Sequence, residues 1–208
     1  MHRLCRPFAG LPPIVGRRRE WERLQSAWRH ADSGKPVFVL VTGEAGIGKS
    51  RLAEELPAWA SRHGVVVARS RSYAAEGQLS LAPVIEWLRS DGLQSHLAGL
   101  APAWLTEISR ILPEILTEHH DLPRPEPIAE YGRRRRFFEA LARAVLAVPP
   151  PVMLFIDDLQ WCDPETLEWL HFLLRFDPTA RLLVIGTANC RRLILCAPFC
   201  YNWGTQSG

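Results

Sequence analysis

The sequence predicts an α/β fold of three layers, in which a parallel sheet is covered by helices on both faces. Strand-length apolar segments occur at residues 37–42, 65–69, 152–156 and 181–187. Segments with helical periodicity lie between them, and strands that alternate with helices are typical of parallel sheets. The chain has 208 residues, of which 47% are hydrophobic and 23% charged. This is enough for one domain with a hydrophobic core.

The N-terminal half begins with a helix expected over residues 18–30, where apolar side chains recur at helical spacing. The apolar run 37–42 follows as the first strand. A second helix is expected over 49–62, and His63-Gly64 ends it because Gly favours a helix C-terminus. The short β-branched run 65–69 is then the second strand.

A helical insertion is expected between the second and third strands. Residues 83–148 are mostly helical in pattern, with breaks near Gly92, Pro102 and Pro113. Three prolines within residues 121–127 predict an extended loop, because proline cannot continue a helix and restricts the residue before it.

The C-terminal half resumes the alternation with a helix over residues 130–147 and a buried strand over 152–156. Asp163 is placed to act as the N-cap of a helix over 164–176, which has Pro as its first residue. The run 181–187 is the fourth strand. These elements complete the parallel arrangement.

A phosphate-binding loop follows the first strand. Residues 43–50 fit G-x-x-x-x-G-K-[ST], and they lie between a predicted strand and a predicted helix, as that motif requires. Backbone N–H groups of such a loop face the phosphates, Lys49 reaches the β- and γ-phosphates, and Ser50 can ligate Mg²⁺. A chance glycine-rich turn is the alternative, and the flanking elements argue against it. The expected ligand-binding residues here are Gly43, Glu44, Ala45, Gly46, Ile47, Gly48, Lys49, Ser50 and Arg51.

Two acids follow the third strand, as in the Walker B pattern of an apolar strand that ends in carboxylates. Asp157 is expected to hold Mg²⁺, and Asp158 is the candidate that polarises the attacking water. The alternative is that the acids only close a turn, which is more plausible for Asp158 than for Asp157.

With these motifs in place, the chain resembles the AAA-related, STAND-type ATPase module of large bacterial regulators, such as LuxR-type transcriptional activators and some nucleotide cyclases. The resemblance covers residues 13–189 and leaves 1–12 as an N-terminal extension and 190–208 as an unassigned tail. The segments that carry it are 14–20, 41–52, 136–141, 157–164 and 186–189.

The resemblance implies further roles. Val15, Gly16 and Arg17 resemble the turn that contacts adenine in such modules. Thr187 and Asn189 lie where the family places its sensor of the γ-phosphate, although members often have Arg at the position of Asn189. Asp158 replaces the Glu typical of fast AAA relatives, which implies slow turnover.

Modules of this kind also have a fifth strand beside the P-loop strand and a helical lid over the nucleotide. The residues after Asn189 are too few for a lid, so we expect the lid to be missing. Residues 193–195 could supply part of the fifth strand. Effector and DNA-binding regions are expected to be absent from this chain.

Residues 133–136 form a run of four arginines. Successive helical residues point about 100° apart, so the run spreads around a helix and one face is expected to be solvated. A phosphate or partner contact is the alternative, and direct DNA reading is not expected, since the net charge is only +3.

The location expected for the chain is the cytoplasm. It has no apolar run of the roughly 18 residues needed for a membrane span and no signal-peptide pattern. Five cysteines, an odd number, argue against a disulfide framework.

These features predict a Mg·ATP-binding domain of a signalling or transcriptional regulator, with possible slow hydrolysis. Two alternatives stay open: a nucleotide-binding switch without turnover, and a DNA-associated AAA ATPase. A nucleotide-dependent oligomer is a further possibility.

Overall fold

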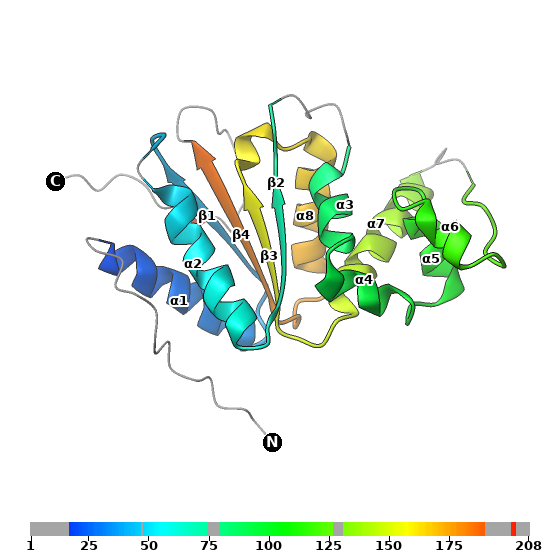
Figure 1. The fold of residues 1–208 in the computed structure, drawn as a ribbon, viewed down its shortest axis with the longest axis horizontal. Coiled ribbons are helices and arrows are strands. Elements are labelled where there is room, and N and C mark those ends of the chain that lie inside the picture. Colours follow the sequence, from blue (N-terminus) through cyan, green and yellow to red (C-terminus); the bar gives the residue numbers. More distant parts are fainter. Residues whose placement is uncertain (1–16, 47, 75–79, 127–130, 190–200, 203–208) are drawn as a thin grey trace, which may run out of the picture.

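A parallel sheet forms the centre of the molecule (Figure 1). The computed structural model describes residues 17–46, 48–74, 80–126, 131–189 and 201–202. Within these residues the strand order is β2-β3-β4-β1-β5, and all paired strands run parallel. The strands are β1 (Val37–Gly43), β2 (Val66–Arg71), β3 (Val152–Asp157), β4 (Leu182–Asn189) and β5 (Tyr201–Asn202).

Helices cover both faces of this sheet, which confirms the three-layer α/β fold. One face carries α1 and α2, and the other carries α3, α7, α8 and the short helices between α3 and α7. The helices are α1 (Arg18–Asp32), α2 (Lys49–Arg62), α3 (Ala82–Leu88), α4 (Asp91–Leu97), α5 (Pro102–Ile108), α6 (Glu114–Glu118), α7 (Tyr131–Leu146) and α8 (Pro164–Phe176), with a 3-10 turn η1 (Leu159–Trp161) after β3.

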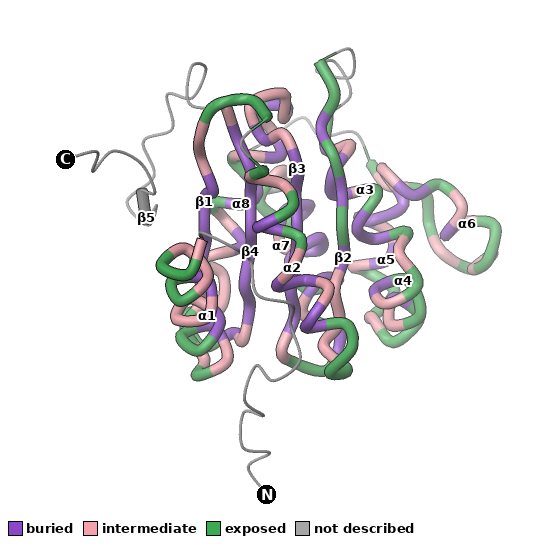
Figure 2. Tube along the Cα trace, turned by 60° about the vertical axis from the view of Figure 1, so that its left-hand side comes forward, coloured by how far each residue is buried: buried purple, intermediate pink, exposed green. Residues whose placement is uncertain are grey.

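The strands are apolar on both faces because both faces are covered. In β1, Val39 and Val41 pack toward α1 and α2, whereas Phe38 and Leu40 pack toward the opposite helical layer. This alternation follows from the two-residue period of a strand. The central strands β3 and β4 are buried along nearly their whole length (Figure 2).

The helical insertion has the expected character. Pro102 is the first residue of α5, and Pro113 directly precedes α6. The break expected near Gly92 falls at Arg89 and Ser90, and Gly92 itself lies within α4. Ser90 is extended and therefore separates α3 from α4 two residues earlier than the glycine suggested.

Two tryptophans pack against each other in the core. Trp87 and Trp169 are fully buried, and their ring centroids lie 6.3 Å apart. Each indole N–H donates to a backbone carbonyl, Trp87 to Phe155 at 3.0 Å and Trp169 to Phe138 at 3.2 Å. The polar atom of each ring is therefore satisfied inside the core.

The P-loop strand β1 lies between β4 and the short strand β5. Its Tyr201 and Asn202 pair with Val39 and Leu40 of β1. Residues 193–195, the segment expected to supply part of this strand, lie outside the described residues. Most of the other residues after Asn189 lie outside them as well, so the expectation of a missing lid stays a prediction. No helix in the described part of the chain has the length and apolar character needed to cross a membrane.

Candidate functional site

The sheet brings four strand ends to one edge. In the β1–β4 ladder Gly43 is the partner of Asn189, and in the β2–β3 ladder Arg71 is the partner of Asp157. All four residues are the last of their strands. Ligands of open parallel sheets bind outside the carboxyl ends of the strands, so this edge is the candidate site.

The P-loop connects β1 to the start of α2 at this edge. Gly46 and Gly48 adopt the left-handed region, with φ of 82° and 85°. A Cβ atom at either position would meet nothing within 4 Å, so the loop needs these glycines for backbone conformation rather than for space. The Lys49 ammonium donates to the Glu44 carbonyl at 2.7 Å, across the loop. Ile47 lies outside the described residues.

Ser50 and Asp157 meet although they are far apart in the sequence. The Ser50 hydroxyl, on the first turn of α2, donates to Asp157 Oδ1 at 2.8 Å. The hydroxyl of Thr187, on β4, donates to the same oxygen. Asp157 is only 6% exposed. Carboxylate and hydroxyl oxygens are ligands that Mg²⁺ accepts, so the residues present fit that ion.

Asp158 has a different environment from that of Asp157. Its carboxylate Oδ2 accepts from Arg71 Nη2 at 2.8 Å and from Arg71 Nε at 3.2 Å. Its Oδ1 accepts from the Gln160 amide at 2.9 Å. The hydrogen bond to Asp158 raises the pKa of Arg71. The candidate for orienting water is therefore held by two side chains of the protein.

The backbone at Asp158 is also specific. Its φ is 58°, in the left-handed region, where Asp is one of the few tolerated residues that are not Gly. Its N–H donates to the Thr187 hydroxyl at 3.0 Å. Thr187, which is 1% exposed, thus contacts both acids, one through its donor and the other through its acceptor.

Asn189 is linked to this group through Gln160. The Asn189 N–H donates to Gln160 Oε1 at 3.0 Å, while the amide of the same glutamine holds Asp158. Gln160 therefore connects the end of β4 to the acid after β3. The candidate residues Asp158 and Asn189 come together in this way.

Sequence reasoning missed the parts played by Arg71 and Gln160. Gln160 was visible as a polar residue two positions after the acids, which is the signal that could have found it. Arg71 lies 86 positions before Asp157, and its proximity depends on the pairing of β2 with β3. No local pattern carries that information.

The remaining candidates lie at other positions. Val15 and Gly16 are outside the described residues, so an adenine contact there stays a prediction. Arg17 directly precedes α1 and forms an ion pair with Glu20 at 3.7 Å. Arg51 is exposed on α2.

Two members of the arginine run are paired with carboxylates on neighbouring helices. Arg134 Nη2 lies 2.7 Å from Glu168 on α8, and Arg136 Nε lies 3.5 Å from Glu107 on α5. Arg135 is exposed. The run is therefore divided among different surroundings, as its helical position predicts.

A comparison with protein-family profiles shows the family of this chain. The profile of the AAA ATPase domain matches residues 13–185, which is most of the chain. The chain belongs to this family. It is an AAA-type P-loop ATPase module, and nucleotide binding is the property that the family and the site share.

Among solved structures, the AAA domain described here is similar to the Orc1 protein of Aeropyrum pernix, determined in complex with DNA. The sequences are 16% identical over 89% of this chain and 41% of that chain, with a TM-score of 0.39. This chain thus spans less than half the length of that protein. A search of curated protein sequences found no match.

Proposed function

We propose that this AAA domain binds Mg·ATP as part of a signalling or transcriptional regulator and hydrolyses it slowly. The observation that carries the proposal is the 2.8 Å hydrogen bond between Ser50 and Asp157 beside the P-loop. It joins the residue that follows the phosphate-binding lysine to the carboxylate that ends β3, which is separated from the P-loop strand β1 by β4. The regulator role is supported by the sequence resemblance alone.

Each residue has a distinct part in the proposed mechanism. Lys49 and the P-loop amides neutralise phosphate charge, and Ser50 and Asp157 hold Mg²⁺. The ion, when bound, supplies positive charge to the phosphate oxygens. Thr187 orients Asp157 through its hydroxyl. Asp158 orients the attacking water once its carboxylate leaves Arg71, and Thr187 or Asn189 senses the γ-phosphate.

Binding is tested by titrating ATP into the wild type and Lys49→Ala in Mg²⁺ buffer. Loss of a charge-assisted phosphate contact is expected to weaken binding by about tenfold or more. The matched control is Lys35→Ala, because Lys35 is exposed before β1 and away from the loop. Equal affinities of the wild type and Lys49→Ala would contradict the proposal.

A nucleotide-dependent switch without turnover is the second candidate. It is favoured by the contacts of Arg71 and Gln160 with Asp158, which occupy both carboxylate oxygens. Phosphate release under single-turnover conditions separates the two functions. The switch predicts a rate at background, whereas slow hydrolysis predicts a rate that Asp158→Asn removes.

A further inference from the structure

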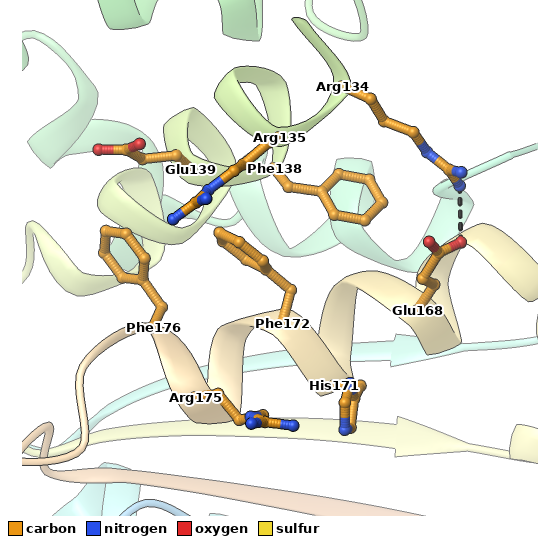
Figure 3. A pocket seen from close by; sticks show the side chains of 9 residues that line it. All are labelled: Arg134, Arg135, Phe138, Glu139, Glu168, His171, Phe172, Arg175 and Phe176. Carbon is orange, nitrogen blue, oxygen red and sulfur yellow. Dashed lines mark hydrogen bonds and ion pairs between the residues drawn. The ribbon is translucent and has the colours of Figure 1, made fainter. Parts of the chain in front are cut away.

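A groove runs along the surface between α7 and α8, outside the nucleotide-binding edge (Figure 3). Its cavity volume is about 720 Å³, and it opens to solvent. Phe138 contributes from α7, and Phe172 and Phe176 contribute from α8. Charged and aromatic side chains from both helices thus line the groove.

The three phenylalanines form a continuous row of rings. The centroids of Phe138 and Phe172 are 5.9 Å apart in an edge-to-face arrangement. The rings of Phe172 and Phe176, one helical turn apart, stack at 5.7 Å. Phe138 is buried, whereas Phe172 and Phe176 are partly exposed. The apolar surface that the row offers to a ligand therefore comes from Phe172 and Phe176.

Both carboxylates of the groove are already neutralised. Glu168 pairs with Arg134 at 2.7 Å, and the guanidinium of Arg134 lies 5.3 Å from the centre of the Phe138 ring. Glu139 pairs with Arg143 at 2.7 Å, and that guanidinium lies 5.6 Å from the Phe176 ring. The two ion pairs lie at opposite ends of the row of rings.

Two further arginines in the lining have no such partner. Arg135 on α7 and Arg175 on α8 are exposed, and neither forms an ion pair with any residue that the structure describes. Positive charge on both helices therefore accompanies the apolar row. A complementary ligand presents apolar groups between carboxylates.

We propose that this groove docks an acidic amphipathic helix of a partner protein. Its apolar side chains pack on Phe172 and Phe176, and its carboxylates pair with Arg135 and Arg175. Helices bind in such grooves through apolar anchors one turn apart, which matches the spacing of the two rings.

Other occupants fit the observations less well. Residues 1–16 and 190–208 contain no Asp or Glu, so these two segments offer no acidic side chain to Arg135 and Arg175. A partner helix with acidic residues of its own supplies both the apolar anchors for Phe172 and Phe176 and the carboxylates for Arg135 and Arg175.

The test uses the full chain and a fluorescent 18-residue helical peptide. The peptide has Leu and Phe at i, i+3, i+4 and i+7 and Glu on both flanks, and a matched peptide has Lys in place of every Glu. We expect the acidic peptide to bind about tenfold more tightly and to weaken as salt rises. No binding at about 1 mM, or equal binding of both peptides, overturns the proposal.

A charge-reversal variant then locates the site. Arg135→Glu/Arg175→Glu is expected to weaken the acidic peptide about tenfold and to improve binding of the lysine peptide. Arg19→Glu/Arg62→Glu, two exposed positions on the opposite helical layer, is the control and should leave binding unchanged. Equal losses in both double variants overturn the assignment, as does an unchanged affinity in the groove variant.

Two further outcomes would assign the groove elsewhere. If the peptides do not bind, and sedimentation shows self-association of the wild type that only Arg135→Glu/Arg175→Glu loses, the occupant is a second copy of this chain. Tighter binding of a single-stranded oligonucleotide than of the acidic peptide makes it a nucleic-acid site. Phe172→Ala tests the apolar row and is expected to lower the affinity for the peptide. A cooperative thermal melt of this variant shows that the loss does not come from unfolding.

Discussion

Arg71 at the end of β2 holds the carboxylate of Asp158, the residue that follows β3. Two guanidinium nitrogens contact the same Asp158 oxygen, at 2.8 Å and 3.2 Å, whereas Arg71 Nε lies 3.8 Å from Asp157. Asp157, in contrast, accepts hydrogen bonds from the hydroxyl groups of Ser50 and Thr187. Arg71 therefore lies within ion-pair distance of both acids, but its hydrogen bonds go to Asp158, whereas Asp157 accepts its hydrogen bonds from two hydroxyl groups.

Replacement of Arg71 tests whether this contact restrains turnover. In Arg71→Met, we expect single-turnover phosphate release to rise about fivefold, because the guanidinium no longer holds the Asp158 carboxylate. Arg89→Met is the control, because Arg89 has similar exposure and pairs with Glu114 in the helical insertion. A rate lower than that of the wild type would mean that Arg71 assists the reaction.

Thr187 is expected to be important for stability as well as for the site. In Thr187→Val the Asp158 N–H and the buried Asp157 carboxylate each lose a partner. Unsatisfied buried polar groups cost about 1–3 kcal/mol, so urea titration should show a loss of that size. Thr117→Val, at an exposed hydroxyl on α6, should stay within about 0.5 kcal/mol. Similar losses in both variants would contradict this prediction.

Asp163 joins α8 to the start of α3. It caps α8 by accepting from the Thr166 N–H at 2.9 Å and also accepts from the Leu81 N–H at 3.1 Å. Asp163→Ala should lower the free energy of unfolding by about 2 kcal/mol, at the upper end for a helix cap. Asp163→Asn keeps an acceptor and should lose less. Equal thermal melts for the wild type and Asp163→Ala would refute the prediction.

Cys162 is expected to be unreactive in the folded protein. Burial raises the pKa of its thiol from 9.0 to about 12. Because the thiolate is the nucleophile, iodoacetamide at about pH 8 should label Cys162 only after unfolding, as peptide mass spectrometry can measure. Labelling of the native protein at the unfolded rate would contradict this.

The same shift gives a pH dependence with a definite sign. Above pH 9.0 the unfolded thiol loses its proton before the folded one, up to about pH 12. The stability of the wild type relative to Cys162→Ala should therefore fall as the pH rises through this window. A difference that is constant or increases would argue against burial as the cause.

Local signals predicted much of the fold. The helices over 49–62 and 164–176 were predicted to the residue, because the P-loop motif and Asp163-Pro164 mark their starts. The extended residue Ser90 separates α3 from α4, whereas the sequence had suggested a break only near Gly92. The family profile likewise matches one continuous stretch of the chain, residues 13–185.

Non-local pairing limited what could be predicted of the site. Arg71 comes near Asp158 only because β2 pairs with β3 in one register. The strand β5 has only two residues, too few for the alternation of apolar and polar residues that predicts a strand. The roles of Val15, Gly16 and Ile47 stay predictions, since these residues are outside the described part of the chain.

The left-handed backbone at Asp158, with φ of 58°, restricts how this domain can evolve. Gly, Asn and Asp tolerate that conformation, whereas most other residues pay about 1–2 kcal/mol for it. A single substitution to Glu would lengthen the acid at the expense of local strain. The accessible changes at this position thus remove the carboxylate rather than extend it, and a lineage gaining a longer acid here would first have to remodel the turn.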